Sequence, residues 1–207
     1  MRFSVTKQLL SPLFPSATNM IRLDHTHVMS TFHQYRPDSP SRVKKGLANT
    51  LCTALEVHAQ LEEEIFYPAV RAVTQNDVIA KSLDEHQEMR RLIGQLRQME
   101  PDTVGYDETV TDLMRDVMHH VADEETLVLP EAERLLADQL GELGMQMTKR
   151  RLQLVGPRSG EIALDMGRAV SGHTLALAMV GVTAMGLLVA RRSGHLDLSR
   201  FRGGRSA

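Results

Sequence analysis

Four stretches of the chain repeat their apolar residues at intervals of three and four positions, and a proline follows each stretch. That interval matches the turn of an α-helix with one buried face. No convincing alternation of apolar and polar residues indicates a strand. The predicted helices cover residues 16–36, 41–67, 75–99 and 107–129. A continuation of the fourth helix past Pro130, over residues 131–140, is the alternative to an end at that proline. Four helices of about 20–27 residues with short connections predict an all-α, up-down-up-down four-helix bundle over residues 16–140.

The segments outside the predicted bundle differ from it in charge and in residue composition. Acidic residues outnumber basic ones 23 to 14 up to Glu142, whereas basic residues outnumber acidic ones 10 to 3 after it. Such a split suggests two physical roles along one chain. We expect an N-terminal arm at 1–15, a basic linker at 141–168 and a basic tail at 191–207.

An uncharged apolar run of 17 residues, 174–190, is followed at once by Arg191 and Arg192. In a helix this run spans about 25 Å, close to the thickness of a bilayer core. Residues 169–190 are therefore expected to form a transmembrane helix that anchors the protein to a membrane, with the bundle in the cytoplasm because no signal peptide precedes it. The alternatives are a fifth helix packed on the bundle or an oligomerisation helix, in a soluble cytoplasmic protein.

The second and fourth predicted helices share the pattern His-x-x-x-Glu-Glu with a proline ten residues after the histidine, starting at His58 and at His120. The first and third share a Leu-Asp pair just before His25 and His86. His25 precedes His58 by 33 residues, and His86 precedes His120 by 34. Two similar helix pairs with the same register indicate an internal duplication.

This register predicts a metal site inside the bundle. Positions four apart lie about 40° apart on one helical face, so each histidine and the glutamate four residues later reach one region. Imidazole and carboxylate groups suit iron, manganese or zinc, and six side chains are sensibly shared between two cations. The candidate ligands are His25, His58, Glu62, His86, His120 and Glu124.

With Asp24-His25, Glu85-His86 and the two His-x-x-x-Glu-Glu motifs, the chain resembles the hemerythrin-like (HHE cation-binding) family over about residues 16–140. The resemblance implies a non-haem centre of two Fe ions, held by the six candidate ligands and bridged by Glu62 and Glu124. Oxygen-carrying hemerythrins have a further histidine where this chain has Arg90. That departure favours the branch tied to iron handling, nitric-oxide response and iron–sulfur repair, although the extra cysteine-bearing domain of the repair proteins is not expected here.

The expected function is binding or sensing of a small ligand (dioxygen, nitric oxide or peroxide) or iron handling, in a metal-binding protein rather than an enzyme. A catalytic di-iron oxidase or peroxidase is one alternative, although ferritin-like oxidases use Glu-x-x-His motifs. A metal-free, membrane-tethered interaction module is another. No nucleic-acid partner is expected, because aromatic residues make up 4% of the chain and tryptophan is absent. The sequence predicts no oligomeric state.

Several residues near the predicted ligands have a second interpretation. Tyr67 is expected at the edge of the core, and a hydrogen bond near the site is the alternative. Four further glutamates are expected on solvated helix faces, with an outer hydrogen bond to the site as the alternative. They are Glu63, Glu64, Glu85 and Glu125.

Overall fold

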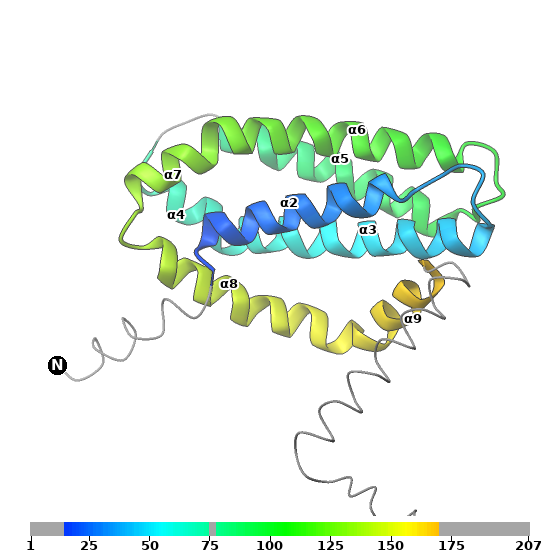
Figure 1. Ribbon diagram of the computed structural model, residues 1–207. Coiled ribbons are helices and arrows are strands. Elements are labelled where there is room, and N and C mark those ends of the chain that lie inside the picture. The colour runs from blue at the N-terminus through cyan, green and yellow to red at the C-terminus, as the bar shows by residue number, and fades with distance from the viewer. Residues whose placement is uncertain (1–14, 75–77, 170–207) are drawn as a thin grey trace, which may run out of the picture. The chain divides into compact units, whose positions relative to one another are not determined.

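The computed structural model describes residues 15–74 and 78–169, and within them four long helical segments run up, down, up and down alongside one another (Figure 1). The first segment is α2 (Ala17–His33) and the third is α5 (Val78–Gln98). The other two contain a π-helical stretch. They are α3 (Ser41–Leu61), η2 (Glu62–Phe66) and α4 (Tyr67–Arg71), and α6 (Tyr106–Asp123), η3 (Glu124–Val128) and α7 (Leu129–Leu135).

Local sequence sets where these helices begin. The Ser16 side chain caps α2 by accepting a hydrogen bond from the Asn19 backbone N–H at 3.3 Å. Pro40 lies directly before α3. Because proline has no backbone N–H, this position adds no further unpaired donor at the start of the helix. Gly105 precedes α6 with φ +88°, a left-handed conformation that glycine adopts at no steric cost.

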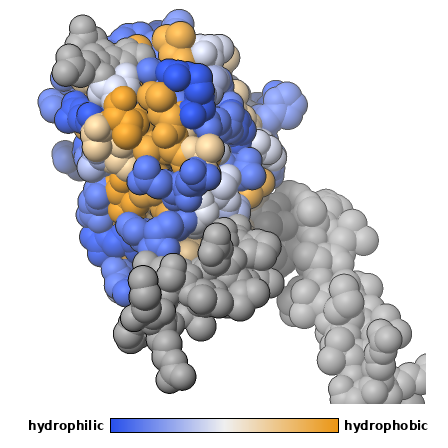
Figure 2. Space-filling view, turned by 90° about the vertical axis from the view of Figure 1, so that its left-hand side faces the viewer, coloured by the Kyte–Doolittle hydropathy of each residue, from blue (hydrophilic) through white to orange (hydrophobic). Residues whose placement is uncertain are grey.

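The apolar core consists of two clusters. One includes Ile21, Leu61 and Phe66, and the other includes Leu51 and Leu113. The first cluster also contains residues of α4, α7 and α8, and the surface at this end of the bundle shows an apolar patch among hydrophilic side chains (Figure 2). On α2 the two clusters take residues 17–21 and 28 onward, so the buried histidine layer lies between them.

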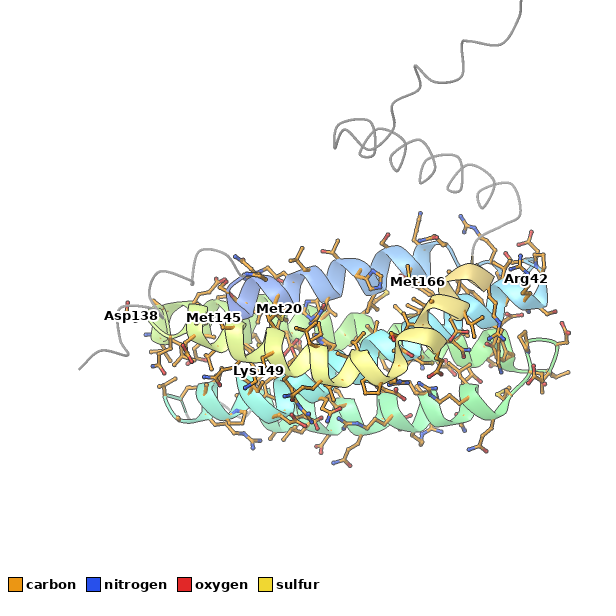
Figure 3. All side chains as sticks on the ribbon, turned by 90° about the horizontal axis from the view of Figure 1, so that it is seen from below. Met20, Arg42, Asp138, Met145, Lys149 and Met166 are labelled. Atoms are coloured by element: carbon orange, nitrogen blue, oxygen red, sulfur yellow. The ribbon has the colours of Figure 1, made fainter. Side chains whose placement is uncertain are left out.

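The segment expected as a basic linker, 141–168, is helical, which corrects that prediction. It forms α8 (Leu140–Val155), the short 3-10 turn η4 (Gly156–Arg158) and α9 (Ser159–Ala169). The buried face of α8 contains Leu140, Leu143 and Met147, a helical spacing. Seen from below, α8 and α9 run along the bundle, with Lys149 on α8 and Met166 on α9 (Figure 3).

The fold prediction of a C-terminal transmembrane helix at 169–190 is also wrong. In residues 15–74 and 78–169, no helix is both long and apolar enough to cross a bilayer. Residues 170–190 of the expected span lie outside the described residues, as do most of the expected arm and the whole basic tail at 191–207. The fold that the structure supports is a helical bundle with two further helices packed on it.

Candidate metal centre

Each of the four long helical segments contributes to one buried layer of histidines and glutamates. None of the six predicted ligands is more than 5% exposed. Histidines come from α2, α3, α5 and α6, and the two glutamates are the first residues of η2 and η3. The structure brings all six together: His25, His58, Glu62, His86, His120 and Glu124.

The six side chains form two overlapping groups. In the first, ligand-type atoms of His25, His58, Glu62 and Glu124 lie within 4.8 Å of one another. In the second, the same holds for Glu62, His86 and His120. The shared Glu62 joins the two groups.

Each glutamate lies between two histidines from different helices. Oε2 of Glu62 is 3.2 Å from His58 Nε2 and 3.4 Å from His86 Nε2. Oε2 of Glu124 is 3.2 Å from His25 Nε2 and 3.4 Å from His120 Nε2. All four histidines therefore turn Nε2 toward a carboxylate oxygen in the centre of the bundle.

The inward-facing atoms are arranged to bind a cation rather than to hydrogen-bond with one another. Four of these atoms are buried and have no hydrogen-bond partner among the described residues: His25 Nε2, His58 Nε2, Glu62 Oε1 and Glu124 Oε2. Buried polar atoms in folded proteins are almost always hydrogen-bonded. Nitrogen and carboxylate oxygen atoms aimed at a common space are the donor set of a metal such as iron, manganese or zinc.

The electrostatics of the layer also favour a cation. Burial and the neighbouring Glu124 carboxylate raise the pKa of Glu62 well above its usual value. Burial lowers the pKa of His58 to about 4, which keeps the imidazole neutral, as a metal ligand must be. Burial would also lower the pKa of His25, but the neighbouring carboxylates of Glu124 and Glu125 raise that pKa to about 9. Two carboxylates buried this close together are therefore more stable with a positive charge beside them.

The other ring nitrogen, Nδ1, of each histidine meets an outer carboxylate. His25 contacts Glu125 at 2.9 Å, His86 contacts Glu63 at 2.8 Å, and His120 contacts Glu85 at 3.1 Å. His58 Nδ1 is 3.5 Å from Oδ2 of Asp24, a looser contact. Burial opposes the ionisation of Asp24, but His58 and Arg151 lower its pKa to about 2. Such partners keep the proton on Nδ1 and leave Nε2 free to bind a metal.

The expected solvated position is therefore wrong for three of the four further glutamates. Glu63, Glu85 and Glu125 each contact a histidine of the layer, and Glu64 instead pairs with Arg150 at the surface. A signal was available in the sequence, since every outer carboxylate is the chain neighbour of a predicted ligand. Asp24 follows the same rule beside His25.

The π-helical stretches begin at the two predicted glutamate ligands and end two residues before the two prolines. The backbone N–H of Tyr67 donates to the carbonyl of Glu62, five residues back, and that of Leu129 donates to Glu124 in the same way. A proline has no N–H and its ring clashes with the carbonyl four residues back, so a widened turn allows the helix to continue. The predicted helix end at Pro68 is therefore wrong, because α4 runs through it. At the second proline, α7 runs through Pro130, which agrees with the alternative that the fourth helix continues.

Tyr67 lies deeper than expected. It is 1% exposed, and its hydroxyl donates to Oε1 of Glu124 at 2.7 Å. Burial and the carboxylates of Glu62 and Glu124 raise its pKa, so the phenol keeps its proton. The duplication gives no hint of this role, because Leu129 occupies the matching position before the second proline.

Comparison with known proteins agrees with this geometry. The sequence model of the hemerythrin HHE cation binding domain family matches residues 16–132. A DNA nickase from Nostoc sp. is 27% identical over 149 residues, which are 72% of this chain and 42% of that protein. The chain thus spans less than half the length of that curated relative. A solved hemerythrin HHE cation binding domain-containing protein from Mycobacterium kansasii shares the fold, with TM-score 0.61, 20% identity, and 74% of this chain and 99% of that one covered.

Proposed function

Because the chain belongs to the hemerythrin HHE cation-binding family, we propose that it holds two non-haem iron ions in the buried layer and binds a small diatomic ligand, dioxygen or nitric oxide. The observation that carries this proposal is the position of the two glutamates. Each has one oxygen between two histidines of different helices, at 3.2 and 3.4 Å. Two carboxylates that each lie between two histidines suit a pair of cations better than a single cation.

The ligand set is compatible with iron, which is the metal that we propose among iron, manganese and zinc. Four imidazoles and two carboxylates provide nitrogen and oxygen donors, and the buried Cys52 is not among the groups. Bound iron would supply one-electron redox chemistry and affinity for diatomic molecules. The Nδ1 partners of the histidines keep Nε2 available, and the Tyr67 hydroxyl holds a proton within 2.7 Å of Glu124.

The burial of the layer favours a small ligand over an organic substrate. His58, Glu62, His86, His120 and Glu124 are at most 3% exposed, which excludes bulky molecules and much of the water. His25 is the most exposed of the six, at 5%, and lines a shallow depression on α2.

Metal analysis of the purified protein tests the proposal. The full chain, loaded anaerobically with Fe²⁺, is expected to retain two irons and to develop new absorption bands on addition of nitric oxide. After oxidation in air it is expected to show a near-ultraviolet absorption that shifts on addition of azide. Fewer than about 0.5 iron per chain after reconstitution at neutral pH would refute it. Sustained turnover of ferrous iron or peroxide over many cycles would instead favour the oxidase alternative.

Adjacent histidines give a matched pair of variants. His120→Ala removes a predicted ligand and is expected to lower the iron content. His119→Ala removes the exposed neighbour of that ligand and is expected to leave the iron content unchanged. Equal loss in both variants would point to a general defect in folding rather than to a site.

The nicking activity named for the Nostoc relative belongs to a longer protein. We propose that nucleic acid is not the partner of this chain, in keeping with its few aromatic side chains. Supercoiled plasmid incubated with the iron-loaded chain is expected to stay supercoiled. Nicking by wild type that His120→Ala abolishes would contradict this and assign the metal site to DNA cleavage.

A further inference from the structure

Each outer carboxylate of the histidine layer is backed by a cation. Glu125 pairs with Arg22 at 3.0 Å, Glu63 with Arg90 at 2.8 Å, and Glu85 with Lys81 at 3.4 Å. Asp24 pairs with Arg151. The four histidines thus each begin a chain of contacts that runs from imidazole to carboxylate to cation.

One of these four cations comes from a different part of the protein. Arg22, Lys81 and Arg90 lie within residues 16–132, the region that the family model matches. Arg151 lies outside it, on α8, and reaches back to α2. This chain of contacts therefore links the layer to a helix that the family match does not include.

The pairing between Arg151 and Asp24 is two-pronged. Nη1 of Arg151 donates to Oδ1 of Asp24 at 2.7 Å, and Nη2 donates to Oδ2. Both side chains line a pocket of about 210 Å³ between the bundle and the α8–α9 pair, whose apolar wall includes Val57, Ile162 and Met166. Figure 3 shows Met166 on the α9 side of this region. A fork-like pair in partly apolar surroundings holds a carboxylate in one orientation.

The orientation of Asp24 matters because its contact with His58 is the loosest of the four. Oδ2 of Asp24 lies 3.5 Å from His58 Nδ1, while the other three histidine–carboxylate distances are between 2.8 and 3.1 Å. The hydrogen bonds that fix this carboxylate come from Arg151 rather than from His58. With a shorter or neutral side chain at 151, Asp24 is free to turn away from His58.

We propose that Arg151 is a positioning residue of the metal centre, which orients His58 through Asp24 and makes α8 part of the site. The inference rests on the proposed function, since it requires a cation bound by His58. It predicts an asymmetric effect. Loss of Arg151 lowers the affinity for a metal ion at the group formed by His25, His58, Glu62 and Glu124. The affinity at the group formed by Glu62, His86 and His120 is unchanged.

The competing explanation is that Arg151 only fastens α8 to the bundle. Its neighbour Arg150 separates the two explanations, because it makes a comparable two-pronged pair with Glu64, at 2.6 and 2.9 Å, between α8 and η2. Glu64 contacts no histidine of the layer. Arg150→Gln therefore removes a similar fastening without touching the contacts of His58.

The experiment is a cobalt titration of the full-length wild type, Arg151→Gln, Arg151→Lys and Arg150→Gln. The visible absorption of bound Co²⁺ and the thermal midpoint are measured for each. Wild type and Arg150→Gln are expected to bind two ions alike. Arg151→Gln is expected to bind one of the two about tenfold more weakly, with an altered band for that ion, as for other outer partners of metal ligands. Arg151→Lys keeps the charge without the fork and is expected to fall between them.

The outcomes separate this inference from the proposed function. Two ions bound by wild type, with Arg151→Gln matching Arg150→Gln in affinity and spectrum, would overturn the role of Arg151 alone. Equal weakening of both ions in Arg151→Gln, together with a lower thermal midpoint, would show a fastening role and overturn it too. A wild-type chain that binds no cobalt and no iron would overturn both proposals.

Discussion

Single residues organise the candidate metal centre through what stands beside each ligand in the chain. Asp24, Glu63, Glu85 and Glu125 are neighbours of predicted ligands, yet each contacts a histidine of a different helix. A residue next to a ligand on a helix is rotated by about 100°, toward the adjacent helix rather than the centre. The duplicated motif thus encodes both the inner donors and the groups that orient them.

Glu85→Gln tests this arrangement. The variant keeps an oxygen near His120 Nδ1 but removes the negative charge that supports it at 3.1 Å. We expect metal affinity to fall by about tenfold, measured by competition with a chelator. Glu88→Gln is the matched control on the same helix, because Glu88 is exposed and pairs with Arg91 at the surface. An equal loss in the control would contradict the role of Glu85.

Tyr67 and Tyr106 form a second comparison. Both are buried, but the Tyr67 hydroxyl donates to Glu124, whereas the Tyr106 hydroxyl has no hydrogen-bond partner. Tyr67→Phe leaves a buried carboxylate oxygen without its donor, so we expect the metal-free protein to lose about 1–3 kcal/mol in the free energy of unfolding. Tyr106→Phe is expected to be neutral or slightly stabilising. Urea denaturation measures both, and a larger loss in Tyr106→Phe would contradict the account.

The sequence predicts which inner side chains come together, but it does not predict the contacts around them. His58 and Glu62 lie on one helical face at a spacing of four, and spacing on a helix is readable without tertiary structure. The contact of Asp24 with His58 or of Tyr67 with Glu124 depends on how two helices pack, which periodicity does not give. The approach of Arg151 depends on a helix that the sequence did not indicate.

At the scale of elements, the π-helical stretches place the two glutamates. The period of apolar residues predicts the helices, but it does not predict a local widening of the turn. Pro68 and Pro130 are typical of helix ends, although the sequence also allows the fourth helix to continue past Pro130. Inside the bundle, tertiary packing on both sides of each proline keeps the helix running, and the carbonyls of Glu62 and Glu124 accept from five residues ahead.

Pro68→Ala tests whether the proline maintains this stretch. Alanine restores the N–H and favours a regular α-helix, which would rotate Glu62 relative to His58. We expect weaker metal binding with no loss of helical content by circular dichroism. Pro130→Ala is the duplicate experiment at Glu124 and is expected to behave alike. Unchanged metal affinity in both variants would show that the prolines do not set the glutamate positions.

At the scale of the whole molecule, α8 and α9 close over one side of the bundle, α8 on α2 and α9 on α3 (Figures 1 and 3). Two glycines permit the contact. A Cβ on Gly144 of α8 would lie 2.2 Å from the carbonyl oxygen of Pro15, and one on Gly46 of α3 would lie 2.6 Å from the backbone of Ala169. In the sequence, Gly144 and the basic residues that follow it resemble a linker, because a close approach of two backbones adds no apolar side chain to the pattern.

Gly144→Ala tests this packing. The added methyl group meets backbone rather than a movable side chain, so we expect a loss of about 1–3 kcal/mol in the free energy of unfolding, measured in urea. Gly94→Ala, on α5, meets nothing within 4 Å and is expected to stabilise the protein by about 0.5–1 kcal/mol. A stabilising Gly144→Ala would contradict the close packing of α8 on the bundle.

The most direct test of the metal centre is an anomalous difference map at the iron edge, from crystals of the iron-loaded full chain. The account predicts two peaks inside the bundle, about 3.5–4 Å apart as in other dinuclear sites, one beside His25 and His58 and the other beside His86 and His120. Iron only at surface carboxylates, or no peak near Glu62 and Glu124, would contradict it.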